Sequence, residues 1–126
     1  MNSFHTNNYL LVNLYKKASL KSEVVTQMIY GESFTIINKY SKWMRIRIKE
    51  DGYIGYIVKR KVTAYLNPTH KVSVVSANIY KNSNLKKKIG KLAYTSKIKV
   101  EKKVAKFAKF QNKWIEVKNI KPINYK

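Results

Sequence analysis

The sequence predicts an all-β protein that contains two copies of one small barrel. In residues 43–48, apolar side chains alternate with a tryptophan and two arginines, which is the period of a half-buried strand. Asp51 and Gly52 follow this stretch and indicate a hairpin, because glycine tolerates the positive φ that a type I′ turn requires. The pattern of the first half then returns in the second half, so one short all-β unit accounts for both.

The first copy, residues 9–66, divides into short strands and turns. We expect strands or apolar runs at 9–15, on both sides of a turn at 30–32, at 43–48 and at 53–58, with 59–65 closing the unit. Gly55 indicates a bulge or a close backbone approach. Asn67 and Pro68 open a linker, residues 67–71, because the residue before a proline avoids helix. The second copy, residues 72–126, is either degenerate or cut short.

Co-linear matches relate the two copies. The longest matching segments are 12–16 with 77–81, 25–30 with 89–94, and 43–47 with 114–118, and shorter matches at 20–21 with 85–86 and at 34 and 36 with 98 and 100 lie between them. The match of 43–47 with 114–118 places Trp43 opposite Trp114. On this alignment the second copy has seven more residues before its tryptophan than the first, and it lacks an Asp-Gly hairpin after it.

The alternation also predicts which side chains of the central strand are buried, because a one-residue slip would turn every side chain over. We expect four buried side chains, Ile46, Ile48, Ile115 and Val117, and four exposed ones, Arg45, Arg47, Glu116 and Lys118.

The chain is strongly basic, with 27 Lys and Arg against 6 acidic residues and a net charge of +21. Residues 1–66 carry 8 Lys and 3 Arg against 4 acids (net +7), and residues 67–126 carry 16 Lys against 2 acids (net +14). Such a charge favours polyanions such as nucleic acid, anionic lipid or acidic wall polymers. Because Lys outnumbers Arg 24 to 3, a general compositional bias with a role in solubility explains the same numbers.

The residue inventory argues against an enzyme. There is no cysteine, and the two histidines, His5 and His70, lie far apart in sequence, so neither a catalytic constellation nor a metal or cofactor site is predicted. The first eight residues lack the pattern of a secretory signal, which makes the cytoplasm the default compartment. No apolar run approaches transmembrane length.

The ordered motifs of the first copy resemble the bacterial SH3 domain. They are Val12-Asn13-Leu14-Tyr15, Ser22-Glu23-Val24-Val25-Thr26-Gln27, Tyr30-Gly31-Glu32, Lys42-Trp43 and Asp51-Gly52-Tyr53-Ile54-Gly55-Tyr56-Ile57. The resemblance covers residues 9–66 well and residues 72–120 more loosely. It implies two tandem SH3-like small barrels.

More narrowly, the chain is similar to the paired SH3 modules that precede the papain-like catalytic domain of NlpC-type peptidases. That family cleaves γ-D-glutamyl–diamino-acid bonds in murein peptides with a cysteine nucleophile. Because this chain has no cysteine, the resemblance implies a targeting or substrate-gating module. It also implies a cell-envelope setting, with murein peptide or a peptidase domain as the partner.

Six residues are candidates for ligand binding: Tyr15, Trp43, Arg45, Tyr53, Tyr80 and Trp114. The tryptophans can form a binding platform, or they can pack against their own barrel or the other one. Tyr15 and Tyr80 border either a ligand groove or a structural corner. An arginine can hold a carboxylate through two hydrogen bonds, or it can lie on a solvated strand face.

Residues 102–113 combine five lysines with Val104, Phe107 and Phe110. The position of the segment between two predicted strands favours an extended hairpin. A short amphipathic helix lying on anionic lipid is the alternative. Lysines with interleaved aromatics also suit single-stranded nucleic acid, so the second candidate function is a basic binder of nucleic acid or anionic surfaces.

Overall fold

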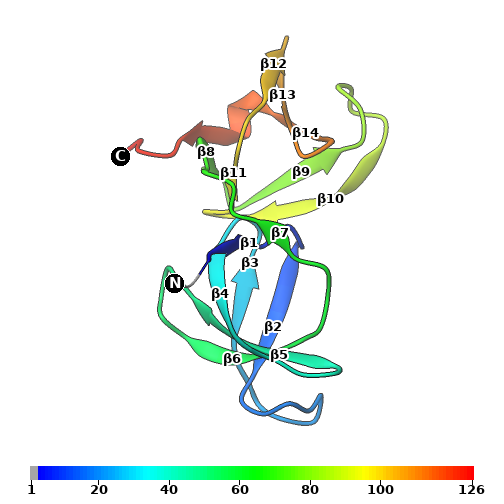
Figure 1. The fold of residues 1–126 in the computed structure, drawn as a ribbon. Helices are drawn as coiled ribbons and strands as arrows, with labels where there is room; N and C mark the ends of the chain where they lie inside the picture. The colour runs from blue at the N-terminus through cyan, green and yellow to red at the C-terminus, as the bar shows by residue number, and fades with distance from the viewer. Residues whose placement is uncertain (1–2) are drawn as a thin grey trace. The chain divides into compact units, whose positions relative to one another are not determined.

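The structure, a computed structural model, describes residues 3–126 (Figure 1). The chain divides into two compact units, residues 1–66 and 67–126, called unit 1 and unit 2. Apart from one short 3-10 helix, the regular elements of the described residues are all strands, which confirms the all-β prediction. Unit 1 contains β1 (His5–Thr6), β2 (Leu11–Tyr15), β3 (Val24–Ile29), β4 (Ser33–Lys39), β5 (Trp43–Ile48), β6 (Ile54–Val58) and β7 (Thr63–Ala64).

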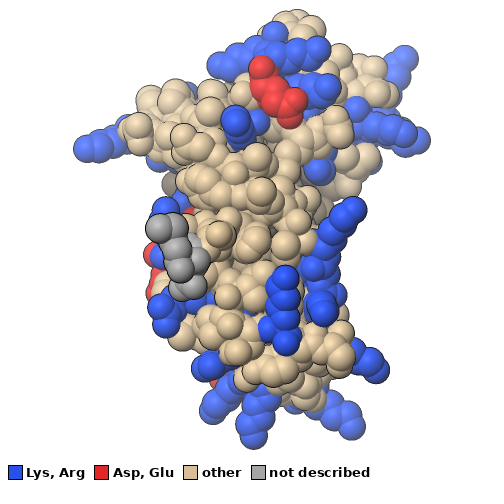
Figure 2. Space-filling model, viewed as in Figure 1, with Lys and Arg blue, Asp and Glu red and all other residues tan. Residues whose placement is uncertain are grey.

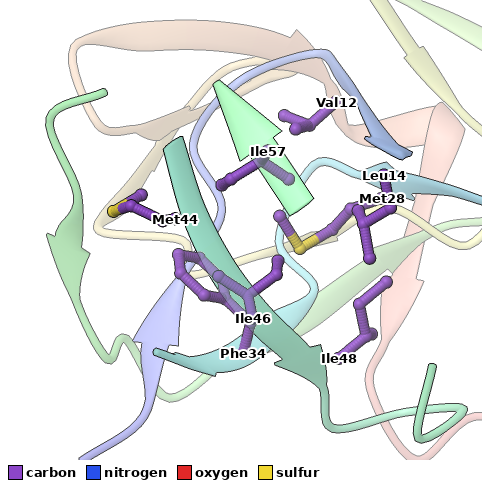
Figure 3. Packing of buried hydrophobic residues seen from close by; sticks show 8 residues of the cluster. All are labelled: Val12, Leu14, Met28, Phe34, Met44, Ile46, Ile48 and Ile57. Carbon is purple, nitrogen blue, oxygen red and sulfur yellow. The ribbon is translucent and has the colours of Figure 1, made fainter. Parts of the chain in front are cut away.

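The seven strands of unit 1 form one antiparallel sheet in the order β3-β2-β6-β5-β4-β1-β7. One face of this sheet encloses the core, because alternate side chains of each strand point to the same side. Figure 3 shows this cluster, which consists of Val12, Leu14, Met28, Phe34, Met44, Ile46, Ile48 and Ile57. Ile46 and Ile48 are fully buried as predicted, whereas Arg47 is exposed and Arg45 is half-buried.

The predicted hairpin between β5 and β6 exists, but its turn is longer than a type I′ turn. Five residues, 49–53, separate the two strands. Gly52 has the expected positive φ of 76°, and its N–H donates to the Ile48 carbonyl over 2.9 Å. The Asp51 carboxylate accepts a hydrogen bond from the N–H of Tyr53 over 2.9 Å. The glycine prediction is therefore confirmed, and the prediction of a two-residue turn is wrong.

Unit 2 has two sheets, in the orders β10-β9-β14-β13-β12 and β11-β8-β15. Its elements are β8 (His70–Val72), β9 (Ser76–Tyr80), β10 (Lys88–Ala93), β11 (Lys97–Ile98), β12 (Lys102–Val104), β13 (Phe107–Phe110), β14 (Lys113–Glu116), the 3-10 helix η1 (Val117–Asn119) and β15 (Ile120–Pro122). Because β8 begins at His70, part of the predicted linker 67–71 is strand.

The strand orders of the two units correspond when β11 and β12 are taken as one interrupted strand in the place of β4. The register supports this correspondence. In unit 1, His5 of β1 pairs with Phe34 of β4, and in unit 2, His70 of β8 pairs with Ile98 of β11. β13, β14 and β15 then occupy the places of β5, β6 and β7.

This register corrects the prediction that Trp43 and Trp114 occupy equivalent positions in the two units. Trp114 of β14 pairs with Tyr80, as Tyr56 of β6 pairs with Tyr15, so Trp114 stands in the place of Tyr56. The place of Trp43, which pairs with Val58, belongs to Phe107, which pairs with Glu116. The reason is the turn of the second hairpin, which is shorter than that of the first and brings β14 earlier in the sequence.

The corrected register also explains a wrong burial prediction. Ile115 is buried, as expected. Val117 is only half-buried, because it begins the 3-10 helix η1 instead of continuing a strand. Of the two residues expected to be exposed beside it, Lys118 is exposed and Glu116 is half-buried.

Residues 102–113 form the predicted extended hairpin and not a helix. β12 pairs with β13, and β13 pairs with β14 across the two-residue turn Gln111-Asn112. Both turn residues have positive φ, 43° and 60°, which is the signature of a type I′ turn. The tight turn predicted for the first hairpin therefore occurs in the second, without a glycine.

Thr95 marks another position where unit 2 uses an unfavourable residue. Its φ is 71°, and it stands in the place of Gly31, whose φ is 87°, in the turn before β4. A β-branched side chain is strained in this left-handed region, and glycine is not. We expect Thr95→Gly to stabilise unit 2 by about 1 kcal/mol, measured by chemical denaturation followed through the indole signal of Trp114. Gly31→Thr, made as the reverse change, should destabilise unit 1; a stable Gly31→Thr variant would contradict this account.

Candidate ligand-binding face

Two aromatic side chains of unit 1 meet on the sheet face opposite the core. Tyr15 ends β2 directly after the buried Leu14, and Trp43 begins β5 directly before the buried Met44. Strand alternation therefore turns both rings outward. Their centroids lie 5.6 Å apart with an interplanar angle of 86°, which is the edge-to-face geometry that aromatic pairs favour.

Tyr56, Tyr40 and Arg45 extend this pair. Tyr56 of β6 is the register partner of both Tyr15 and Arg45, so it lies between β2 and β5. The Arg45 guanidinium lies 6.0 Å from the centroid of the Tyr56 ring. The centroids of the Tyr40 and Tyr56 rings lie 6.2 Å apart. We call these five residues, Tyr15, Tyr40, Trp43, Arg45 and Tyr56, the aromatic face of unit 1.

Three of the predicted site residues of the first copy are thus brought together, and one is not. Tyr53 lies in the turn of the β5–β6 hairpin. Trp43 pairs with Val58 at the opposite, open end of the same hairpin. Tyr53 is about half exposed. Sequence reasoning missed Tyr56 as a site residue. Its neighbours Gly55 and Ile57 face the core, so strand alternation alone indicates that the Tyr56 ring faces outward.

Unit 2 holds a corresponding set. The rings of Tyr80 and Phe107 are 6.2 Å apart at 89°, in the places of Tyr15 and Trp43. Trp114 pairs with Tyr80 on one side and with Lys109, in the place of Arg45, on the other. The Nζ of Lys102 lies 5.9 Å from the Trp114 ring. We call these residues the aromatic face of unit 2.

The two faces differ in how much of the first tyrosine is accessible. Tyr80 is 5% exposed, so in unit 2 it supports its neighbours more than it offers a surface. This fits the structural-corner interpretation for Tyr80, whereas Tyr15 is half-buried and shares its surface with Trp43. Each face joins an edge-to-face aromatic pair to a cation, which suits a ligand with an apolar part and an anionic group.

Most acidic side chains accept hydrogen bonds from backbone N–H groups in or beside turns. Four of the six accept a backbone N–H: Glu32 from Ile29 (2.7 Å), Glu50 from Ser33 (3.0 Å), Asp51 from Tyr53 (2.9 Å) and Glu101 from Gln111 (2.7 Å). On the side that Figure 2 shows, Lys and Arg are spread over the surface and acidic side chains are few. The positive charge is therefore not neutralised by a matching number of surface ion pairs.

Tyr30, His70 and Lys113 have shifted pKa values, and these residues lie outside the aromatic faces. Burial raises the pKa of the Tyr30 hydroxyl and lowers the pKa of the Lys113 ammonium. Burial, and then the nearby Lys103, lower the pKa of His70. Within residues 3–126, His, Asp and Glu form no group of three that could hold a metal ion. The same residues contain no helix long and apolar enough to cross a membrane.

Comparison with known families identifies the first unit. Residues 14–62 match the family described as the bacterial dipeptidyl-peptidase SH3 domain. These residues form a bacterial SH3 domain. They include the end of β2, the strands β3 to β6 and the whole aromatic face of unit 1. No curated protein matches the chain.

Solved structures add a likeness of fold. A NlpC/P60 family protein from Bacillus cereus matches with a TM-score of 0.73 and 14% identity, over 94% of this chain and 56% of that one. The chain thus spans little more than half the length of that protein. Two NlpC structures from Trichomonas vaginalis match at 15% identity and a TM-score of 0.40, over 100% of this chain and 49% and 46% of theirs. The bacterial SH3 match and the fold shared with the Bacillus cereus protein agree with the resemblance found in the sequence.

Proposed function

We propose that this chain is a non-catalytic binding module that recognises murein peptide through its aromatic faces. The observation that carries the proposal is the pair of edge-to-face aromatic contacts, Tyr15–Trp43 and Tyr80–Phe107, at corresponding positions of two units. Residues 67–126 act in this proposal as a second, divergent bacterial SH3 domain. The module works beside a papain-like peptidase domain, to which it brings substrate or whose access it gates.

The chemistry of the face of unit 1 suits a peptide with free carboxylates. Trp43 and Tyr56 offer flat apolar surface, on which peptide backbone and short aliphatic side chains can pack. Arg45 stands beside Tyr56 and can bind a carboxylate through two parallel hydrogen bonds. Murein stem peptides combine both features.

The second candidate function is the binding of nucleic acid or anionic surfaces. The net charge of +21 favours it, as does the position of Lys102 beside the ring of Trp114 in unit 2. Such binding weakens steeply with salt, because each neutralised phosphate releases counterions. Binding that depends on an aromatic pair and one or two charged anchors persists at physiological salt.

The two candidates are separated by titrating a soluble murein tetrapeptide and a short single-stranded DNA into the wild type and Trp43→Ala. We expect the peptide to bind at physiological salt and to lose about tenfold or more in affinity in Trp43→Ala. Tyr53→Ala is the matched control, because it removes an exposed tyrosine of the same unit outside the face, and it should bind normally. Tight, salt-sensitive DNA binding that ignores Trp43→Ala, with no peptide binding, would establish the second candidate instead.

A further inference from the structure

Three lysines of unit 2 lie side by side across three strands. In the sheet β11-β8-β15, Lys97 pairs with Lys71, and Lys71 pairs with Lys121. Residues directly opposite in an antiparallel pair have Cβ atoms about 5 Å apart. The neighbouring residues Val72 and Ile98 are buried, so alternation places the lysines together on the opposite face. We call this set the lysine row.

The fold does not require charge at these positions. In unit 1 the corresponding register partners are Ser33, Thr6 and Thr63. All three are small polar residues; Thr6 and Ser33 are each 5% exposed, and Thr63 is half-buried. Like charges directly opposite in a sheet are destabilising. Repulsion between Lys71 and Lys121, which are directly opposite, therefore costs unit 2 stability, and an anion lying against them would offset it.

A surface cavity of about 420 Å³ lies beside two members of the row. Lysines and tyrosines make up most of its wall, which consists of Lys71, Val72, Ser73, Tyr94, Thr95, Lys121, Tyr125 and Lys126. The wall contains no Asp or Glu side chain. A cavity of this size and charge suits a small anion or the anionic end of a larger ligand.

Contacts within the wall hold two of the lysines in place. Lys71 Nζ donates one hydrogen bond, of 2.7 Å, to the Tyr125 carbonyl, and an ammonium has three donors. Lys121 Nζ lies 5.1 Å from the centroid of the Tyr125 ring. The strained φ of Thr95 lies on the same rim, and strain of this kind concentrates at ligand sites.

We propose that this cavity is a binding site for a phosphate-bearing anion, separate from the aromatic faces. Phosphate fits better than a single carboxylate, because its greater charge offsets the repulsion between neighbouring ammonium groups. Lysine binds phosphate as a point charge and does not need the planar fork of arginine. The site belongs to unit 2 alone, since unit 1 has Thr6 and Thr63 where unit 2 has Lys71 and Lys121.

The test replaces the two lysines by the residues of unit 1, in the variant Lys71→Thr/Lys121→Thr. Sodium pyrophosphate is titrated at constant ionic strength and followed by NMR shifts of β8 and β15. We expect saturable binding by the wild type and at least tenfold weaker binding by the variant. Lys86→Thr/Lys87→Thr, which removes the same charge from the exposed loop between β9 and β10, should bind like the wild type.

A second readout is the stability of the ligand-free protein. In low salt, Lys71→Thr/Lys121→Thr should unfold at a higher denaturant concentration than the wild type, because the repulsion is gone. Lys71→Gln/Lys121→Gln keeps a long polar side chain without the positive charge and should lose pyrophosphate binding as well. Equal pyrophosphate binding by the wild type and both row variants, or the same shifts with sodium chloride alone, would overturn the proposal.

Vesicles separate the possible sources of the phosphate group. Phosphatidylglycerol vesicles that bind the wild type but not the row variants, compared with phosphatidylcholine vesicles, identify a lipid headgroup. Binding of pyrophosphate without vesicle binding identifies a soluble or polymer-borne phosphate. Failure of both ligands at the lysine row refutes the site, whatever the aromatic faces bind.

Discussion

Phe110→Ala is expected to destabilise unit 2 by about 3–5 kcal/mol, the range for deleting a buried phenylalanine. Phe110 is 0% exposed and lies on the core-facing side of β13, in the place that Ile46 occupies in β5. The cavity left by the ring cannot be filled, because the strand is held on both sides by β12 and β14. Denaturation followed through the two indole N–H signals separates the units, since Trp43 reports unit 1 and Trp114 reports unit 2.

Phe107→Ala is the matched control for this prediction. Phe107 lies on the same strand three residues earlier, with its ring against Tyr80 on the face opposite the core. It is half-buried, so its removal should cost less than half as much stability. If residues 102–113 formed one side of an amphipathic helix, the two phenylalanines would contribute alike. Equal destabilisation by both variants would therefore contradict the register described above.

The buried faces of unit 1 could be predicted because each strand repeats its pattern with period two. Ile46, Ile48 and the close approach at Gly55 follow from residue types alone. Register across strands could not be predicted in the same way. It is set by hydrogen bonds between segments that are distant in sequence, and one side chain such as Trp114 can stand in more than one place.

The sequence repeat is therefore misleading where the two copies are aligned on identical residues. Trp43 and Phe107 occupy one position, and Tyr56 and Trp114 another, because each position requires an outward aromatic ring and not a particular one. Matching the two tryptophans required seven extra residues in the alignment. The true difference between the units is the length of the hairpin turn.

Turns in unit 2 were also hidden from sequence reasoning. Gln111, Asn112 and Thr95 all adopt positive φ, and no glycine in these turns indicates that conformation in the sequence. Tertiary pairing of the flanking strands imposes these conformations at a cost of about 1 kcal/mol each. The lysine row could not be predicted from the sequence either, because its members come from three separate segments and meet only through the register of β8.

Gly55→Val is expected to destabilise unit 1 by about 2–3 kcal/mol, because the site has no room for a side chain. A Cβ at this position would lie 3.0 Å from Leu14 Cβ and 3.1 Å from the Tyr15 carbonyl oxygen. β2 and β6 would have to move apart, and Tyr15 and Tyr56 would move with them. The variant should therefore also weaken peptide binding, if the aromatic face of unit 1 is the site.

Gly52→Ala separates this steric effect from the effect of glycine's backbone freedom. A Cβ at Gly52 meets nothing within 4 Å, but the φ of 76° makes any side chain strained. We expect a loss of about 1 kcal/mol and unchanged peptide binding, because the turn lies away from the aromatic face. Both variants are measured by the Trp43 indole signal during denaturation, with Trp114 as the internal reference. A Gly55→Val protein as stable as Gly52→Ala would show that β2 and β6 are not packed as closely as described.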